Sequence, residues 1–239
     1  MKRWVLITRG SSEVEELARG LPNNLELVPF PVLRLAPHSS EAAWQQLEQH
    51  LGTLDLLAFT SKHAPEPFFQ QAAHRNLDRQ LKKLPIAAVG SATAAACRQQ
   101  GLEVIICGQA GGSQLARLIL QHFTAPFTAV LPCGRDYREE LETELGQAGA
   151  RVIPVPVYAM EPASPEELPP LPSDPPAAIV VTSPRAAAFY WGATQGRFAG
   201  SPHLVLGPTT AMALEKLGVP PQMLAKPSMQ NLLEELCRI

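Results

Sequence analysis

The stretch Arg151-Val-Ile-Pro-Val-Pro-Val-Tyr158-Ala-Met160 has the aliphatic run typical of a β-strand and leads from a helical segment into a proline-rich one. A related stretch, Leu27-Val-Pro-Phe-Pro-Val-Leu33, lies within a strand predicted over residues 25–35. The pattern P-x-P-V recurs at an interval of 125 residues, from Pro29 to Pro154. In each case it ends a strand–helix–strand unit. The sequence therefore indicates one structural unit used twice, with these strands as the crossings between the copies.

Other landmarks repeat in the same order along the chain. Each pairs the end of a predicted strand with its equivalent: Leu57-Ala-Phe-Thr-Ser61 with Val180-Val-Thr-Ser183, Ala88-Val-Gly-Ser-Ala-Thr93 with Val205-Leu-Gly-Pro-Thr-Thr210, and Val5-Leu-Ile-Thr-Arg9 with Val130-Leu-Pro-Cys-Gly134. An ordered set with small gaps is stronger evidence for a duplication than any one motif.

Composition and alternation predict the fold class. The chain has 239 residues, of which 46% are apolar, so it can form two domains with buried cores. Apolar strands alternate with amphipathic helices, which favours α/β domains whose parallel sheets are covered on both faces. With 20 basic and 22 acidic residues, no overall field recruits nucleic acid or a membrane surface. Any anionic ligand must then be held by local groups.

The cysteines and the N-terminus bear on location. The chain has four cysteines, which show neither C-x-x-C pairing nor metal-ligand spacing: Cys97, Cys107, Cys133 and Cys237. We predict buried free thiols in a reducing cytoplasm and no metal site. No apolar run approaches about 18 residues, and a strand begins already at Trp4. We therefore expect no membrane partner.

Five loops that follow predicted strands carry the same kinds of residue. Each couples a hydroxyl, and often a glycine, to the start of a helix: Thr8-Arg-Gly10, Thr60-Ser-Lys-His63, Gly90-Ser-Ala-Thr93, Thr182-Ser-Pro-Arg185 and Gly207-Pro-Thr-Thr210. Backbone N–H groups at helix starts bind anions. A serine or threonine there is more often only an N-cap. Five such loops on two related halves favour a cleft that binds several carboxylates or phosphates.

The cations near these loops are Arg9, Lys62, His63, Arg135 and Arg185. Any single one is more often a solvated surface charge than a ligand contact. Lys62 and Arg185 carry more weight because they flank equivalent serines in the two copies.

Tyr158 lies at the exit of its strand, where the alternation calls for an aliphatic residue and where the first copy has Leu33. A tyrosine in a strand is usually packed in a core with its hydroxyl paired. It could instead donate a proton at the mouth of a cleft. No established catalytic or nucleotide-binding motif occurs. The residues alone predict a cofactor-free, two-lobed protein that binds anions, and leave open whether its domains are sequential or interleaved.

Taken together, the strand-end motifs and the segment Val155-Pro-Val-Tyr158 resemble the uroporphyrinogen-III synthase family over essentially the whole chain. The resemblance implies two flavodoxin-like α/β domains with parallel sheets, joined by a two-stranded β-ladder. The first domain would be discontinuous, with residues 1–35 plus 160–239, and the second would comprise residues 38–156. Residues 30–38 and 153–160 would be the connecting strands.

The family's reaction closes the linear tetrapyrrole hydroxymethylbilane to uroporphyrinogen III, with loss of water and inversion of ring D. It uses no cofactor, and Tyr158 would donate a proton to the departing hydroxyl. His63 stands where many members carry arginine, so a carboxylate contact there would depend on pH. By carry-over of the motifs, Ser61, Thr93, Ser183, Thr209 and Thr210 would be binding hydroxyls, together with neighbouring backbone N–H groups. With the cations and turn residues of the same loops, the predicted substrate-binding set is Arg9, Ser61, Lys62, His63, Gly90, Ser91, Thr93, Ser183, Arg185, Gly207, Thr209 and Thr210.

Two other interpretations compete with an enzyme. One is a non-catalytic two-lobed binder of a small anionic ligand. The other is a response-regulator-like interaction module, which is weakened because Thr8-Arg9 stands where paired acidic residues are expected. For the synthase we expect neither nucleic acid nor membrane as a partner, and a transient contact with the enzyme that supplies hydroxymethylbilane.

Overall fold

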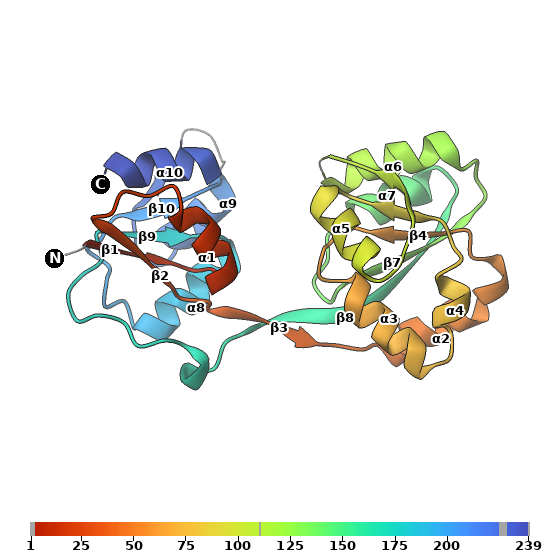
Figure 1. Ribbon diagram of the computed structural model, residues 1–239, viewed down its shortest axis with the longest axis horizontal. Coiled ribbons are helices and arrows are strands. Elements are labelled where there is room, and N and C mark those ends of the chain that lie inside the picture. Colours follow the sequence, from red (N-terminus) through yellow and green to blue (C-terminus); the bar gives the residue numbers. More distant parts are fainter. Residues whose placement is uncertain (1–2, 110, 225–228, 239) are drawn as a thin grey trace. The chain divides into compact units, whose positions relative to one another are not determined.

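The structure is a computed structural model that describes residues 3–109, 111–224 and 229–238. The chain divides into two compact units, Met1–Arg34 with Glu161–Ile239 (unit 1) and Leu35–Met160 (unit 2). It passes into unit 2 through β3 (Leu33–Pro37) and returns through β8 (Arg151–Pro162), which are hydrogen-bonded neighbours (Figure 1). The predicted class, two α/β units with a discontinuous first one, is confirmed.

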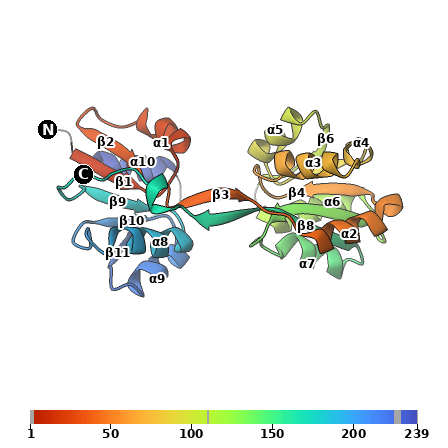
Figure 2. The same cartoon turned by 90° about the horizontal axis from the view of Figure 1, so that it is seen from below.

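The described part of unit 1 contains a five-stranded parallel sheet in the order β11-β10-β9-β1-β2 (Figure 2). Numbered within the unit, this is the order 2-1-3-4-5 of flavodoxin-like folds. The strands are β1 (Arg3–Ile7), β2 (Leu25–Pro29), β9 (Ala178–Val181), β10 (His203–Val205) and β11 (Pro221–Met223).

Helices cover both faces of this sheet because side chains alternate along each strand. Val5 and Ile7 pack with α1 (Ser11–Ala18) and α10 (Met229–Arg238). Trp4 and Leu6 pack on the opposite face, with α8 (Pro184–Thr194) and α9 (Pro208–Glu215). The proline-rich segment after β8 lies in unit 1 and contains a short 3-10 helix, Pro165–Glu167.

Unit 2 repeats the arrangement with a different chain order. Its sheet has the order β3-β8-β7-β4-β5-β6, and the strands from β8 to β6 are parallel. If β7 and β8 are counted first, as the sequence repeat requires, the order is again 2-1-3-4-5. The further strands are β4 (Leu56–Phe59), β5 (Ile86–Ala88), β6 (Val104–Cys107) and β7 (Thr128–Gly134).

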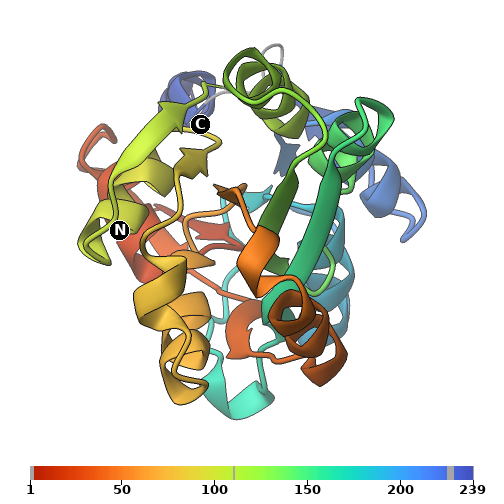
Figure 3. The same ribbon diagram turned by 90° about the vertical axis from the view of Figure 1, so that its right-hand side faces the viewer.

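Helices also cover both faces of the unit 2 sheet (Figure 3). One face packs against the helices α2 (Glu41–Gln49), α3 (Pro65–His74), α4 (Asp78–Leu81) and α5 (Ser91–Gln99). The other face packs against α6 (Gly111–His122) and α7 (Glu140–Gln147). None of the helices in the described ranges has the length and apolar content that crossing a bilayer requires.

The prediction of one strand over residues 25–35 is wrong. β2 ends at Pro29, opposite Ile7, where its neighbour β1 also ends. Pro31 has no N–H with which to continue a ladder. The chain therefore leaves the sheet at Phe30, which is buried in the core of unit 1, and begins β3 at Leu33.

The prediction that all the cysteines are buried is wrong for two of them. Cys97 and Cys133 are buried, whereas Cys107 and Cys237 are exposed. Cys107 ends β6, the edge strand of its sheet. Cys237 lies in the last turn of α10.

We expect a thiol reagent at about pH 8 to modify Cys107 and Cys237 in the native protein, and the other two cysteines only after unfolding. Burial raises the pKa of Cys97 and of Cys133 to about 12, so neither forms the reactive thiolate. Colorimetric titration with and without denaturant, with peptide mapping, measures this. Rapid labelling of Cys97 or Cys133 in the native protein would contradict it.

Candidate active site

In an open parallel sheet, ligands bind beyond the carboxyl ends of the strands, where the strand order reverses. In unit 2 this switch point lies between β7 and β4. A pocket of about 390 Å³ opens there. Its lining comes from the ends of β4, β5 and β7, from β8 at Tyr158, and from the starts of α6 and α7. The lining residues are Thr60, Ser61, Val89, Gly111, Gly112, Gly134, Asp136, Tyr137, Arg138, Glu140 and Tyr158.

Tyr158 lies at this pocket with its ring against Gly134. A Cβ atom added at Gly134 would lie 2.8 Å from Cε2 of Tyr158 and 3.1 Å from its hydroxyl oxygen. The first of these separations is too short for real carbon atoms. The ring can therefore take this position only because residue 134 has no side chain.

A β-bulge brings the two residues opposite each other. Along β7 and β8, Cys133 pairs with Pro156, but the next residue, Gly134, pairs with Tyr158. Val157 is thus the extra residue of β8 and has no partner in β7. Bulges next to functional sites commonly redirect a side chain. Without this one, Val157 would lie opposite Gly134, and Tyr158 would lie beyond the end of β7.

The surroundings of Tyr158 keep its phenol protonated. Burial raises the pKa of Tyr158 and outweighs the hydrogen bond from Ser61, which lowers it. Ser61 Oγ also accepts the backbone N–H of His63, at 3.2 Å. The His63 ring packs edge-on against the ring of Tyr158, with 6.1 Å between the ring centroids.

The other predicted residues of unit 2 lie at the same edge. Gly90 is the N-cap of α5 and offers no side chain to cap this helix. Ser91 is exposed, whereas Thr93 is only 4% exposed. The burial of Thr93 favours a contribution from the backbone N–H groups of this turn over one from its hydroxyl. Lys62 is exposed beside His63, just before α3 begins.

In unit 1 the switch point lies between β1 and β9, and two threonines join the strand ends. Thr182 N–H donates to Thr8 Oγ1 at 3.1 Å, and the two hydroxyl oxygens are 3.2 Å apart. Ser183 Oγ accepts the N–H of Ala186 at 3.1 Å and is therefore the N-cap of α8. The capping role considered from the sequence is present at Ser183.

The remaining predicted residues of unit 1 follow the neighbouring strands β1, β9 and β10. Arg9 and Arg185 are half-buried, next to the ends of β1 and β9. Gly207 is the N-cap of α9, Thr209 is exposed, and Thr210 is only 4% exposed. The fold thus brings the predicted residues of each unit to the carboxyl edge of that unit's own sheet.

Comparison with protein families shows to which family the chain belongs. The model of the uroporphyrinogen-III synthase HemD family matches residues 13–234. This chain belongs to that family. The family's activity is that of a lyase-type cyclising enzyme in tetrapyrrole biosynthesis, and a non-catalytic binder is not favoured. Comparison with curated proteins gives no significant match.

Solved structures of other uroporphyrinogen-III synthases share the fold. A mutant enzyme from the extremely thermophilic bacterium Thermus thermophilus is 19% identical, with 99% of each chain covered and a TM-score of 0.61. The enzyme from Helicobacter pylori is 17% identical, with 98% of each chain covered and a TM-score of 0.60. The wild-type Thermus enzyme is 20% identical, with 99% of this chain and 97% of that chain covered and a TM-score of 0.51.

Within this synthase fold, sequence reasoning missed Gly134 and the α7 side of the pocket. In the sequence, Gly134 stands out only as the counterpart of Arg9 in the repeat. The repeat held a usable signal, because the end of β7 is equivalent to the end of β1 and therefore borders the switch point. On the α7 side, Tyr137 donates to Glu142 Oε2 at 2.5 Å. Burial raises the pKa of Tyr137, so it also stays protonated.

Proposed function

We propose that this protein is a uroporphyrinogen-III synthase, which closes hydroxymethylbilane to uroporphyrinogen III with loss of water and inversion of ring D. The family match over residues 13–234 carries the proposal. A second observation supports it, namely a half-buried tyrosine with a raised pKa at the switch-point pocket of unit 2. Such a group holds a proton at neutral pH and can transfer it to a departing hydroxyl.

The chemistry requires little covalent help from the protein. Loss of the hydroxymethyl oxygen gives an azafulvene cation, which attacks the substituted carbon of ring D. The resulting spiro-pyrrolenine fragments and recloses with ring D inverted. The protein therefore has two tasks: to protonate the leaving hydroxyl, which we assign to Tyr158, and to hold the chain in a geometry that excludes simple head-to-tail closure.

Binding of the eight substrate carboxylates is assigned to residues at the carboxyl edges of the two sheets. α3, α5, α8 and α9 each follow a strand at this edge of its sheet. The first N–H groups of a helix lack intrahelical partners and favour anions. The proposed contacts are Arg9, Ser61, Lys62, His63, Gly90, Ser91, Thr93, Ser183, Arg185, Gly207, Thr209 and Thr210, with backbone N–H groups for the buried threonines.

The direct test supplies the protein with hydroxymethylbilane generated in situ, oxidises the products and separates the porphyrin isomers. We expect isomer III in excess over a control without protein. In that control, hydroxymethylbilane closes spontaneously to isomer I. Formation of isomer I alone by a correctly folded sample would reject the synthase activity.

The double variant Lys62→Ala/Arg185→Ala should raise KM more than it lowers kcat. Each side chain is proposed to bind substrate carboxylates in the ground state and the transition state alike, so its removal weakens uniform binding. The matched control is Lys83→Ala/Lys216→Ala. It removes one exposed cation from each unit near the amino ends of the strands and should leave both constants unchanged. A fall in kcat at constant KM would show that Lys62 and Arg185 act in the transition state.

The proposal also covers the cell biology of the enzyme. We place the reaction in the cytoplasm, which is supported by four free cysteines, none of which forms a disulfide.

We further propose a transient contact with the enzyme that supplies hydroxymethylbilane, since this linear product closes spontaneously to the wrong isomer when released. Crosslinking of the two enzymes during turnover tests this contact.

A further inference from the structure

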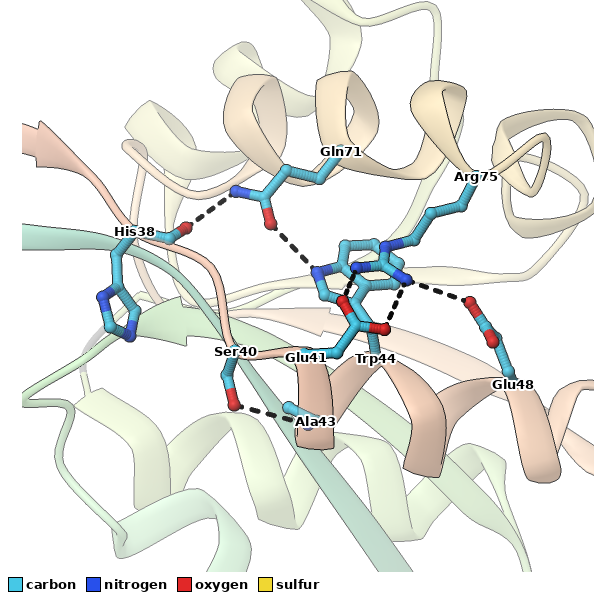
Figure 4. Close-up of polar contacts among 8 residues, drawn as sticks. All are labelled: His38, Ser40, Glu41, Ala43, Trp44, Glu48, Gln71 and Arg75. Carbon is cyan, nitrogen blue, oxygen red and sulfur yellow. Dashed lines mark hydrogen bonds and ion pairs between the residues drawn. The ribbon is translucent and has the colours of Figure 1, made fainter.

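The side-chain amide of Gln71 in α3 makes three hydrogen bonds, and Figure 4 draws the two to Trp44 and His38. Its Oε1 accepts the indole N–H of Trp44 at 2.9 Å. Its Nε2 donates to the carbonyl of His38 at 2.8 Å and to the carbonyl of Val157 at 3.3 Å. One residue thus connects a helix of the core to the segment after β3 and to β8.

The chemistry of the partners determines which way the amide faces. The indole N–H of Trp44 can only donate, and backbone carbonyls can only accept. The oxygen of Gln71 must therefore face Trp44, and its two N–H groups must face the carbonyls. Trp44 is completely buried, so the acceptor for its N–H cannot be replaced by bulk water.

The position of Val157 gives these contacts a consequence for the site. Val157 is the bulged residue of β8 and directly precedes Tyr158. Besides the bond from Gln71, its carbonyl accepts a long hydrogen bond of 3.4 Å from the N–H of His38. Gln71 therefore restrains the peptide group that sets the direction of Tyr158.

The other polar contacts of α3 do not reach this point. Arg75, one turn further along the helix, pairs with Glu41 and with Glu48 of α2 (Figure 4). Its guanidinium also lies over the ring of Trp44, at 5.1 Å from the ring centre. These contacts join α3 to α2, whereas the Gln71 amide reaches the strand that carries Tyr158.

We propose that Gln71 is a positioning residue for the reaction: it holds the β8 bulge at Val157 and thereby keeps the phenol of Tyr158 opposite Gly134. This inference rests on the proposed function and on Tyr158 as the proton donor. Gln71 is not among the residues that line the pocket, so it acts only through Tyr158.

The test compares Gln71→Met with Phe69→Leu in the isomer assay. Methionine keeps the size of the side chain and removes all three hydrogen bonds. Phe69 lies in the same helix and packs in the same core, but its side chain has no polar atom with which to hold β8. We expect both variants to lower the melting temperature. Only Gln71→Met should lower kcat, by about 10-fold at unchanged KM. The reason is that the rate of proton transfer falls steeply when the acid group is displaced.

A second comparison separates positioning from general destabilisation. In a Tyr158→Phe background, Gln71→Met should lower the melting temperature as before but cause no further loss of kcat. If Gln71→Met does not fold, Gln71→Glu serves in its place, since it keeps the acceptor for Trp44 and loses both donors.

The possible outcomes distinguish the two proposals. Absence of isomer III with the wild-type protein would reject the synthase activity itself. An active wild type with full kcat in the folded Gln71 variant would overturn only the role of Gln71. A fall in kcat with Phe69→Leu equal to that with Gln71→Met would also overturn it, as would an equal loss in the Tyr158→Phe background.

Discussion

Tyr158→Phe should lower kcat by about 10²–10⁴-fold, the usual contribution of one general acid. The substitution keeps the ring that fits against Gly134 and removes only the hydroxyl. KM should change little, because the phenol acts on the leaving group and does not bind a carboxylate. Steady-state isomer assays under initial-rate conditions measure both constants.

The pH profile follows from the environment of the phenol. Burial raises the pKa of Tyr158 above the ordinary phenol value of 10.0. Since the acid form is the active one, deprotonation of Tyr158 should not reduce kcat until the pH exceeds that value. A decline in kcat between neutral pH and 10.0 that disappears in the Tyr158→Phe variant would contradict the assigned environment.

The matched control removes a buried phenol hydroxyl outside the site. Tyr190 is completely buried in unit 1 and hydrogen-bonded to His203 at 3.2 Å. Tyr190→Phe should lower the free energy of unfolding by about 1–2 kcal/mol and leave kcat unchanged. Full activity of Tyr158→Phe would transfer the acid role to water or to a carboxyl group of the substrate.

Gly134→Ala should lower kcat by about 10²-fold through its effect on the same phenol. The added Cβ would lie 2.8 Å from the ring of Tyr158, so the ring or the end of β7 must move. Gly134 does not have a positive φ, so alanine fits its backbone conformation without strain. The expected loss therefore arises from displacement of the phenol, and KM should change less than kcat.

Gly146→Ala is the control in the same unit. Gly146 lies in α7, and a Cβ there would meet nothing within 4 Å. This variant should be stabilised by about 0.5–1 kcal/mol and remain fully active. Normal kcat in Gly134→Ala, with a crystal structure showing Tyr158 unmoved, would refute the proposed contact. In the Tyr158→Phe background, Gly134→Ala should add little further loss.

Local signals in the sequence predicted the alternation of strands and helices and the relation between the two halves of the chain. Apolar runs and helical spacing marked the strands and helices, and the repeat matched the end of β4 with that of β9 and the end of β5 with that of β10. The structure confirms these equivalences, because each pair occupies the same place in its sheet. The roles of the substrate-binding residues stay predictions.

The errors arose where neighbours in space decide the outcome. The strand predicted over residues 25–35 breaks because β1, its partner, ends at Ile7. Cys107 is exposed because β6 has a neighbour on one side only. An apolar pattern indicates that a residue tends to be buried, but it does not reveal which partner covers it.

The sequence by itself determined the α/β class, the duplication and the resemblance to the synthase family, because each is written in local periodicity or in ordered motifs. Only the tertiary structure decided that Gly134 faces Tyr158, that Val157 is bulged and that Gln71 restrains it. These relations depend on strand register and on hydrogen bonds between segments up to 86 residues apart. Register is set by the packing of whole faces, so no single stretch of the chain encodes it.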